Sequence, residues 1–388
     1  NILKKINVVV IGSGAYVCGK NTSGFGTILP CLIEATRKEL INKITIVSKN
    51  SSTEKIFSKK LKNIQALSKI KLNCIWFNKK NNSSSDYKQA IDESDENTVV
   101  IVATPDHLHY EMTKYALENF KHVLVVKPLT SKTNEAKSLI KISKKNNLLS
   151  VVDFHKRYDL VNLKLKDMVE KNKIGLPQYF HVEYSQHKEI PEKLFKSWIQ
   201  FTNIFQYLGV HYVDIIHFVT GATPIRVMAV GQKNILNKNY PNTFDSIQTL
   251  IEWKYKKKKF VSSILCNWID PSATSAVSYQ SIKVIGTEGR IESDQKNRGY
   301  EIISNQGIEN LNPYFNQDYL IDEKYYFKGY GIDSIVQFFS DSFNIINKNK
   351  TLKSISKNRP TFENTFSSVS VIESANKSLK SNGKWVSC

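Results

Sequence analysis

Near the start of the chain the stretch Ile6-Asn-Val-Val-Val-Ile11 runs directly into Gly12-Ser-Gly14. A short, continuous apolar run is typical of a buried strand, and the glycines predict a tight turn into a helix. Such a turn lets backbone amides approach a pyrophosphate at the positive end of the helix. The third glycine of the G-x-G-x-x-G pattern is missing, because Val17 stands at its place. Gly12 and Gly14 therefore predict either a dinucleotide cradle or a glycine turn without a ligand.

Residues 6–130 repeat this alternation of short Val/Ile runs and longer helical patterns, which is typical of a parallel α/β sheet. Residues 15–23 are interpreted as an insertion, after which Gly24-Phe-Gly-Thr27 resumes the turn and a helix follows over 28–40. The further strands of this sheet are expected at 43–47, 98–103, 122–126 and 148–154. We expect a doubly wound parallel sheet, the Rossmann fold, over residues 1–154.

From residue 178 the pattern changes to closely spaced strands with hairpin-like connections. It indicates an open, mostly antiparallel sheet with helices on one face. The strands are expected at 179–186, 225–231, 246–253, 260–267 and 281–285, and closing helices at 326–347 and 362–381. An α+β domain for substrate binding and oligomerisation is therefore expected over 155–388, with its C-terminal helices free to pack back on the first domain.

The length of 388 residues suits two domains, and the hydrophobic content of 41% indicates a globular chain. The formal net charge of +20 raises the question of nucleic-acid binding. The lysines, however, are spread along the chain, and their densest cluster, 254–259, is interpreted as the tip of a hairpin. A basic surface that attracts anionic substrates is favoured, and no nucleic-acid partner is expected.

Five scattered cysteines, without a C-x-x-C pair, indicate reduced thiols and no structural metal site. No apolar run approaches the length of a membrane helix, and the first residues lack the layout of a signal peptide. The sequence therefore predicts a cytoplasmic protein with no membrane partner and no bound metal.

The strand expected at 43–47 ends in Ser48-Lys-Asn-Ser-Ser52. An NAD-preferring site is expected to place Asp or Glu here, where it would bind the ribose 2′-hydroxyl. The hydroxyls and the lysine suit a 2′-phosphate instead, although an ordinary polar loop has the same composition. Ser48 and Lys49 therefore favour NADP over NAD as the cofactor.

Two neighbouring strands end in Thr104-Pro-Asp-His-Leu-His109 and in Lys127-Pro128. Ligands of open α/β sheets bind at the carboxyl edge of the strands, where both loops are expected. A lysine at a strand end is ordinarily a surface residue, but two such loops beside one crevice favour a ligand site. Thr104, Pro105 and His109 are therefore predicted cofactor contacts, together with Lys127.

Residues 205–218 form a predicted helix that carries a candidate base. Its apolar face contains, at helical spacing, Phe205, Leu208, Tyr212, Val213 and Ile216. Tyr207, His211 and Asp214 share another face of the same helix. An imidazole between a phenol and a carboxylate can accept a proton near neutral pH. The alternative is a histidine at the edge of the core that is satisfied by Asp214.

These motifs resemble those of the glucose–fructose oxidoreductase/inositol dehydrogenase (Gfo/Idh/MocA) family. The matching stretches are Gly12-x-Gly14, 103–109, Val125-Val-Lys-Pro-Leu129, Gly209-Val-His-Tyr-Val-Asp214, 283–292 and the closing segment from Arg359-Pro360 to residues 381–386. The resemblance implies an NAD(P)-dependent oxidoreductase that acts on a hydroxyl-bearing carbon of a sugar or nucleotide-sugar. Lys127 would orient and polarise the substrate, and His211 would be the general acid/base. It further implies a homodimer or homotetramer formed through the C-terminal sheet.

The sequence departs from the family pattern at residues that bear on catalysis. Tyr207 stands where many members have an aspartate, and Val126 stands where glutamate usually precedes Lys-Pro. A phenol has a reference pKa of about 10 and is a poor base at neutral pH. A non-catalytic dinucleotide- or sugar-binding regulator on the same fold is therefore the alternative. Tyr207 remains a catalytic and substrate-pocket candidate, because a phenol can donate a hydrogen bond or relay a proton. Asp214 is a further substrate-pocket candidate, as are His155, Arg157 and Trp198 by motif position or loop context.

Overall fold

The computed structural model describes residues 3–78 and 85–388, and the chain forms two compact units. The first unit contains Asn1–Thr130, Asn134–His155 and Tyr314–Thr365, and the second contains Ser131–Thr133, Lys156–Pro313 and Phe366–Cys388. The chain passes from one unit to the other at His155 and Lys156, beside the predicted boundary at 154/155. Residues 314–365, which the sequence assigned to the second domain, belong to the first unit.

The first unit is built on a six-stranded sheet in which every pair of neighbours is parallel. In sheet order the strands are β3 (Asn73–Phe77), β2 (Ile41–Val47), β1 (Ile6–Ile11), β4 (Thr98–Val102), β5 (Val123–Val126) and β6 (Ser150–Asp153). The strand order reverses between β1 and β4, as in a doubly wound dinucleotide-binding fold. The predicted Rossmann fold is thereby confirmed.

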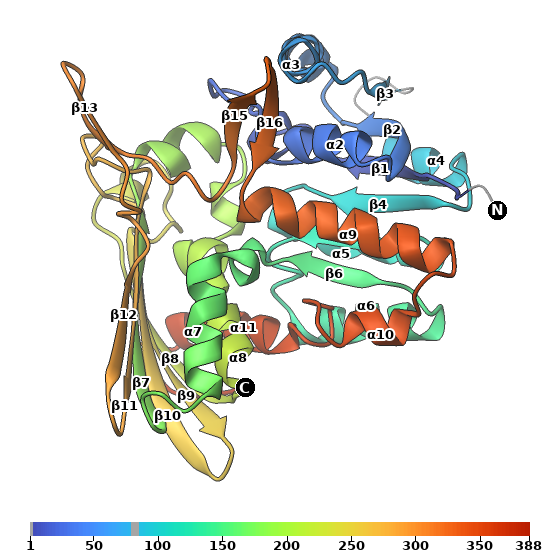
Figure 1. The fold of residues 1–388 in the computed structure, drawn as a ribbon. Helices are drawn as coiled ribbons and strands as arrows, with labels where there is room; N and C mark the ends of the chain where they lie inside the picture. The colour runs from blue at the N-terminus through green and yellow to red at the C-terminus, as the bar shows by residue number, and fades with distance from the viewer. Residues whose placement is uncertain (1–2, 79–84) are drawn as a thin grey trace. The chain divides into compact units, whose positions relative to one another are not determined.

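Helices cover both faces of this sheet, which is why the central strands β1, β4 and β5 are almost entirely apolar. They are α2 (Ile28–Arg37), α3 (Glu54–Ser68), α4 (Asp86–Asp92), α5 (His109–Glu118), α6 (Thr133–Lys145) and α9 (Tyr330–Ile346), with the short α10 (Leu352–Ser356). In Figure 1, α2 and α9 lie side by side over one face. Ile335 and Phe339 of α9 are fully buried in the core of this unit.

The predicted helix over 326–347 is wrong at its beginning. Helix α9 starts only at Tyr330, because β15 (Gln317–Ile321) and β16 (Lys324–Lys328) form an antiparallel hairpin before it. Asp322 and Glu323 turn this hairpin with φ angles of 49° and 63°. The aromatic residues from 325 to 327 suit a strand as well as a helix, and cross-strand pairing decides between them.

The second unit is built on a seven-stranded sheet, ordered β12-β11-β7-β10-β9-β8-β17. Its strands are β7 (Pro177–Gln186), β8 (Thr223–Gln232), β9 (Ser246–Tyr255), β10 (Lys258–Asn267), β11 (Ser278–Gly286), β12 (Arg290–Asp294) and β17 (Val386–Ser387). All neighbours are antiparallel except β7 and β10, so the predicted mostly antiparallel sheet is confirmed. The predicted hairpin tip at 254–259 is the turn between β9 and β10.

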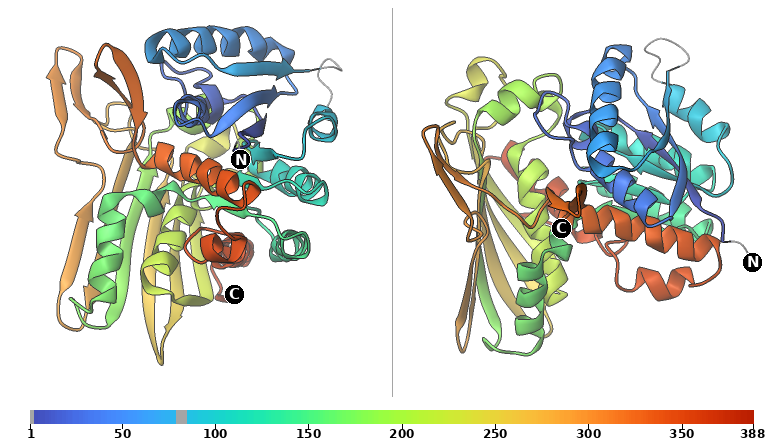
Figure 2. Two further views of the ribbon diagram at one scale, coloured as in Figure 1. Left: turned by 45° about the vertical axis from the view of Figure 1, so that its right-hand side comes forward. Right: turned by 45° about the horizontal axis from the view of Figure 1, so that its top comes forward.

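Three helices pack on one face of this second sheet: α7 (Leu160–Glu170), α8 (Val210–Thr220) and α11 (Phe366–Lys380). Figure 2 shows all three on the same side, and none of them covers the opposite face. The apolar side chains predicted for 205–218 are all buried against this face. A separate hairpin, β13 (Glu301–Ser304) with β14 (Gly307–Asn310), follows β12.

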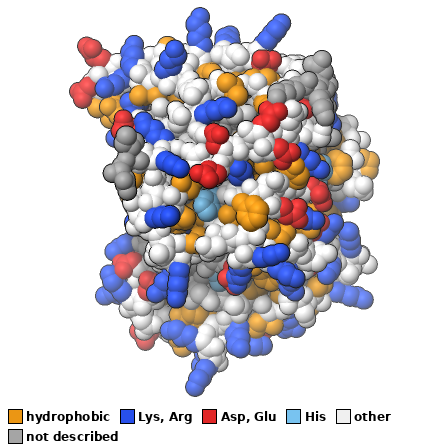
Figure 3. All heavy atoms as spheres, turned by 90° about the vertical axis from the view of Figure 1, so that its right-hand side faces the viewer, with side chains coloured by type: hydrophobic (Ala, Val, Ile, Leu, Met, Phe, Trp, Pro, Cys, Tyr) orange, Lys and Arg blue, Asp and Glu red, His pale blue; other side chains and the backbone are white. Residues whose placement is uncertain are grey.

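On one face of the molecule the basic side chains are dispersed rather than gathered. In Figure 3, Lys and Arg side chains are scattered over the face in view, with Asp and Glu side chains between them. Among the residues that the structure describes, no helix has both the length and the apolar character needed to cross a membrane.

Candidate functional site

The glycine turn after β1 has the backbone geometry of a cradle. Gly12 has a φ of +123°, and a Cβ added there would lie 2.1 Å from the carbonyl oxygen of Ala103, which follows β4. A Cβ at Gly14 would meet no atom within 4 Å, so the backbone is open at this point. A one-turn helix, α1 (Ala15–Cys18), begins directly after Gly14 within the segment interpreted as an insertion, and α2 begins at Ile28. The turn therefore fits the phosphates of a dinucleotide.

Ser48, at the end of β2, faces into the protein. Its Oγ lies 2.7 Å from Ser13 Oγ and 3.3 Å from Thr53 Oγ1, and its side chain is buried. Lys49, in contrast, is exposed to solvent. Residues 48–53 contain no carboxylate that would bind a ribose diol. Of the two predicted cofactor contacts here, Lys49 is therefore the one whose side chain is accessible.

His109 joins the loops that follow β4 and β5. One ring nitrogen lies 2.6 Å from the carbonyl oxygen of Pro128, and the other lies 2.8 Å from the carbonyl oxygen of Thr104. The imidazole is fully buried, so it holds both loops at the same edge of the sheet. The peptide bond before Pro128 is cis. The structure thus brings Thr104, His109 and Lys127 together, as the sequence predicted, while Pro105 caps the short helix η2 (Asp106–Leu108).

Lys127 lies at this edge among charged neighbours. Burial lowers its pKa from the ordinary 10.5 to about 7, and the carboxylates of Asp106 and Asp153 oppose that change by raising the pKa. Part of the Lys127 side chain is still accessible to solvent, which weakens the effect of burial. A lysine in this environment changes its charge near neutral pH, which suits a residue that polarises an oxygen atom or exchanges a proton.

Asp153, the last residue of β6, was not predicted as a site residue. Its carboxylate accepts hydrogen bonds from the hydroxyls of Tyr16 in α1 and Ser334 in α9. Burial raises its pKa, and the two hydroxyls and Lys127 act in the opposite direction. An aspartate at the end of an apolar strand, at the same sheet edge as Lys127, was the available sequence signal.

The predicted helix over 205–218 has two parts in the second unit. Residues Phe205–Gly209 form a π-helical turn, and α8 continues from Val210. His211 is buried, and its ring lies 6.0 Å from the ring of Tyr184, centroid to centroid. Single π-helical turns occur often at functional sites, because they change the direction of the side chains that follow.

Asp214 is paired with Arg157. Its two carboxylate oxygens accept from Arg157 Nε at 2.7 Å and Nη2 at 2.6 Å, and both side chains are buried. A bidentate pair of this kind fixes helix α8 to the segment that precedes α7. The structure thus places the Asp214 carboxylate in a pair that supports α8. His155 packs against the rings of Phe315 and Tyr330 in the first unit.

Tyr207 and Trp198 lie in one aromatic cluster. The ring centroid of Tyr207 is 4.6 Å from Phe195, 6.1 Å from Trp198 and 6.1 Å from Trp268. Tyr207 and Trp198 are half-buried, whereas Trp268 is fully buried. Tyr207 thus packs in an aromatic cluster, whereas Asp214 pairs with Arg157, and Phe195 and Trp268 are neighbours of Tyr207 that the sequence did not indicate.

Lys156 is a second buried lysine that the sequence did not indicate. Its ammonium lies 5.0 Å from the ring centroid of Tyr184 and 5.2 Å from that of Tyr212, and it donates to Gln280. The side chain is 1% exposed. Contacts with two aromatic faces stabilise a desolvated ammonium. The positive charge therefore lies beside the tyrosine that packs against His211.

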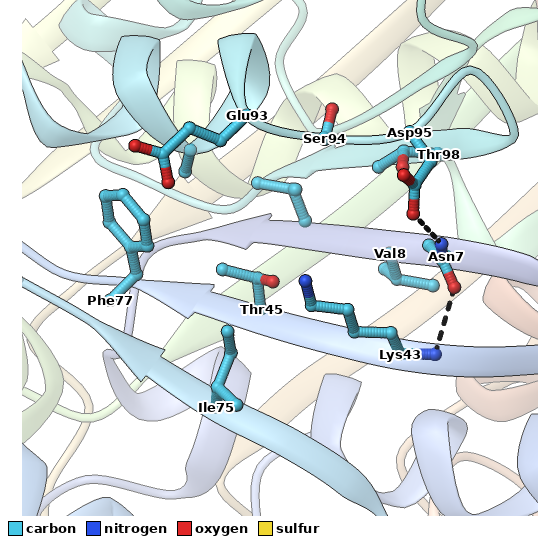
Figure 4. A pocket seen from close by; sticks show the side chains of 12 residues that line it. Asn7, Val8, Lys43, Thr45, Ile75, Phe77, Glu93, Ser94, Asp95 and Thr98 are labelled. Atoms are coloured by element: carbon cyan, nitrogen blue, oxygen red, sulfur yellow. Dashed lines mark hydrogen bonds between the residues drawn. The ribbon is translucent and has the colours of Figure 1, made fainter.

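A hollow in the first unit lies at the other end of the sheet from the glycine turn (Figure 4). It is lined by β1, β2 and β3 and by the loop after α4, and Asn7 donates to Asp95 at 2.8 Å on its rim. Asn7 is at the amino end of β1, whereas the glycine turn is at its carboxyl end. Ligands of α/β sheets bind at the carboxyl end, so we assign no role to this hollow.

A doubly wound sheet with an open glycine turn, and with a lysine at its carboxyl edge, defines the class of dinucleotide-binding α/β proteins. Comparison with protein families agrees with this class. Residues 6–154 match the oxidoreductase family with an NAD-binding Rossmann fold, and residues 162–292 match the GFO/IDH/MocA C-terminal domain. The chain therefore belongs to the Gfo/Idh/MocA oxidoreductase family.

Individual relatives are more distant. The chain is 24% identical over 213 residues to the uncharacterized oxidoreductase YrbE of Bacillus subtilis (strain 168), which covers 54% of this chain and 59% of the relative. It is 29% identical over 196 residues to the scyllo-inositol 2-dehydrogenase (NAD(+)) of the same organism, which covers 50% and 54%. The chain thus matches somewhat more than half the length of these two relatives.

A crystal structure of scyllo-inositol dehydrogenase from Lactobacillus casei, with bound NAD(H) and scyllo-inositol, has the same fold. The TM-score is 0.69 at 16% sequence identity, and the comparison covers 99% of each chain. At this level of identity the likeness concerns the fold alone.

Proposed function

We propose that the protein is an NAD(P)-dependent dehydrogenase or reductase that acts on a hydroxyl-bearing carbon of a sugar, sugar alcohol or nucleotide-sugar. The observation that carries this proposal is Lys127, which follows β5 at the carboxyl edge of the Rossmann sheet, beside the loop after β4 that His109 joins to Pro128. Family membership and the inositol dehydrogenases among the relatives support it. The chemistry requires an oxygen-polarising group and an acid/base beside the cofactor.

Lys127 would supply the first of these groups. In its charged form the ammonium donates a hydrogen bond to the substrate oxygen and stabilises negative charge that develops there. The open backbone at Gly14 would hold the phosphates of the dinucleotide, which when bound accepts or delivers the hydride. Thr104, Pro105 and His109 shape the same edge of the sheet.

His211 would be the acid/base. Neutral imidazole accepts a proton near neutral pH, and the buried position in α8 protects the side chain from bulk water. Arg157 and Asp214 hold α8 in place from within the same unit. Tyr207 can donate a hydrogen bond to a substrate hydroxyl, and its ring, together with Trp198, offers an apolar face to a sugar ring.

The proposal includes the cofactor preference, the oligomeric state and the location of the protein. The exposed Lys49 and the absence of a carboxylate over 48–53 favour NADP over NAD. The uncovered face of the second sheet favours a homodimer or homotetramer. A cytoplasmic location remains a prediction from cysteine usage and composition.

The test is a turnover assay with NAD and NADP against a panel of polyols, sugars and nucleotide-sugars, followed by the absorbance of the reduced nicotinamide. We expect Lys127→Ala and His211→Ala each to lower kcat/KM about 10²-fold or more. Lys144→Ala, on an exposed lysine of α6, is the matched control and should leave it unchanged.

Two outcomes would contradict the proposal. If both variants turn over an identified substrate as fast as the wild type, the role assignment is wrong. If the protein binds a dinucleotide tightly but turns over no member of the panel, the alternative of a non-catalytic regulator is supported, as Tyr207 and Val126 suggest.

A further inference from the structure

Three adjacent strands of the first unit lead to charged side chains at one edge of the sheet. Asp106 follows β4, Lys127 follows β5, and Asp153 ends β6. Strand β5 lies between the other two, and its last residue, Val126, pairs with Asp153. Because Lys127 is the next residue, the sheet places the lysine between the strands that carry the two carboxylates.

Asp153 is the more firmly held of these carboxylates. It is 2% exposed, and each of its oxygens accepts a hydrogen bond, Oδ2 from Tyr16 and Oδ1 from Ser334. The two donors come from α1 and α9, so three elements fix one carboxylate. Hydroxyl donors favour the charged form of a carboxylate, because they replace the water that burial removes.

We propose that Asp153 is a positioning residue for Lys127: its carboxylate keeps the lysine ammonium charged and in place, and Tyr16 and Ser334 hold that carboxylate. The inference rests on the proposed function for its catalytic meaning, but the link between the two side chains can be tested without turnover. It gives a role to Tyr16, which lies in the segment that interrupts the usual glycine fingerprint.

The direction of the coupling follows from charge. Burial lowers the pKa of Lys127 to about 7, and Asp106 and Asp153 raise it. Reciprocally, Lys127 lowers the pKa of Asp153, which burial raises. Removal of the charge at Asp153 therefore lowers the pKa of Lys127 further, so that the ammonium loses its proton at a lower pH.

Other titratable groups near this cluster come from each of the elements packed around it. Burial, and next to it the charge of Asp153, raises the pKa of the Cys31 thiol of α2 well above its ordinary value, so that this thiol is neutral at neutral pH. Burial raises the pKa of Asp333 in α9. His109 is bound to two backbone carbonyl oxygens, and His155 packs against two aromatic rings. The charges that act on Lys127 are those of Asp106 and Asp153.

The direct test is an NMR titration of the full chain with lysines labelled with carbon-13 at Cε. The Lys127 signal is assigned from its absence in Lys127→Arg. In Asp153→Asn, which keeps the shape of the side chain, we expect this signal to titrate about 1 pH unit lower than in the wild type, or more. Glu118→Gln, on an exposed carboxylate at the end of α5, is the matched control and should leave the Lys127 titration unchanged.

The second readout is the pH dependence of kcat/KM. If charged Lys127 is the required form, activity falls as pH rises through its pKa, and Asp153→Asn moves that fall to lower pH. Tyr16→Phe and Ser334→Ala should each move it in the same direction by less, because each removes one donor that keeps Asp153 charged.

The outcomes separate the inference about Asp153 from the proposed function as a dehydrogenase or reductase. An unchanged Lys127 titration in folded Asp153→Asn overturns the inference, whatever the activity. A shifted titration in a protein without turnover upholds the inference and contradicts the proposed function. If Asp153→Asn does not fold, the same titration in Tyr16→Phe and Ser334→Ala decides, and an unchanged signal in both overturns the inference.

Discussion

Tyr207 shows how one residue changes the assignment of roles at the candidate site. The family resemblance predicts an aspartate at this position, but the structure places the phenol ring among Phe195, Trp198 and Trp268. A phenol with a reference pKa of about 10 does not act as a base at neutral pH. The ring at this position therefore has a packing role, and His211 is left as the proposed base.

Tyr207→Phe tests this division of roles, because it removes the hydroxyl and keeps the ring. We expect kcat to stay within about tenfold of the wild-type value, since one neutral hydrogen bond contributes about 0.5–1.5 kcal/mol. His211→Ala should lower kcat about 10²-fold or more. Steady-state kinetics on the same substrate compares them, and equal losses in the two variants would mean that the phenol takes part in proton transfer.

Substitution of Lys49 tests the predicted preference for NADP over NAD. Because Ser48 faces inward, the 2′-phosphate of NADP would depend mainly on the exposed ammonium of Lys49. We expect Lys49→Ala to weaken NADP binding about tenfold and to leave NAD binding unchanged. Lys59→Ala, on an exposed lysine of α3, is the control. Fluorescence titration measures the affinity for each cofactor. An equal fall in the affinities for NADP and NAD would contradict the assignment of Lys49 to the 2′-phosphate.

At the residue scale the sequence predicts the motif positions better than their contacts. Lys127, His109 and Thr104 lie together as expected, because they follow neighbouring strands in register. The partners of Asp153 are 137 and 181 residues away in the sequence, and no local pattern indicates them. The inward orientation of Ser48 likewise depends on Ser13, 35 residues away.

At the scale of elements, the buried strands were predictable because their period and composition are unambiguous. Strand β1 has the predicted bounds, Ile6–Ile11, and β7 to β11 are longer than predicted by a few residues at most. The hairpins over 301–328 were missed, because their alternation is weak and their side chains are largely exposed. Pairing between strands, which a single segment does not encode, decides such elements.

The glycine turn after β1 allows a prediction about stability in which Gly14 is the control for Gly12. Gly12→Ala adds a Cβ that would lie 2.1 Å from the carbonyl oxygen of Ala103, at a φ of +123°. We expect a loss of about 2 kcal/mol or more in the free energy of unfolding. Gly14→Ala meets no atom within 4 Å, and the change should stay within about 1 kcal/mol.

The same pair separates folding from binding. If the open backbone at Gly14 holds phosphates, Gly14→Ala should weaken dinucleotide binding although the protein remains stable. Thermal unfolding and cofactor titration of both variants measure the two effects. Unchanged cofactor affinity in Gly14→Ala would place the phosphates elsewhere.

The buried pair of Arg157 and Asp214 fixes α8, so its loss should act on the stability of the second unit. Arg157→Ala leaves the Asp214 carboxylate buried without this partner, and we expect a loss of about 3–5 kcal/mol in the free energy of unfolding. Lys171→Ala, which removes an exposed partner of Asp167, should cost less than about 1 kcal/mol. Denaturant unfolding gives both values, and similar small changes would show that Asp214 is well solvated after the substitution.

At the scale of the whole molecule, the net charge of +20 is not concentrated in one patch on the face that Figure 3 shows. The sequence already suggested this, because the lysines are not clustered in one segment. A dispersed positive charge attracts anionic small molecules over long distances, without defining a particular binding surface. It also means that association between copies must overcome like-charge repulsion, which an apolar surface can offset.

The uncovered face of the seven-stranded sheet is the surface that fits such an association. Its exposed side chains include Tyr179, Val230, Leu250 and Val261, from four neighbouring strands. In the register of the sheet, Val261 is opposite Tyr179 of β7 on one side and opposite Glu252 of β9 on the other. Apolar side chains on this face therefore alternate with polar side chains, and Glu252 among these forms an ion pair with Arg226. Flat sheet faces of this composition are suited to pack against a second copy.

If the protein is an oligomer through this face, Val261→Glu should weaken the association about tenfold or more, because it buries an unpaired charge. Leu160→Glu, which changes an exposed side chain of α7 away from this face, should leave the oligomer intact. Light scattering coupled to size-exclusion chromatography, over a range of protein concentrations, measures both. A wild-type protein that is monomeric throughout, or a Val261→Glu variant that associates as well as the wild type, would exclude this face as the subunit interface.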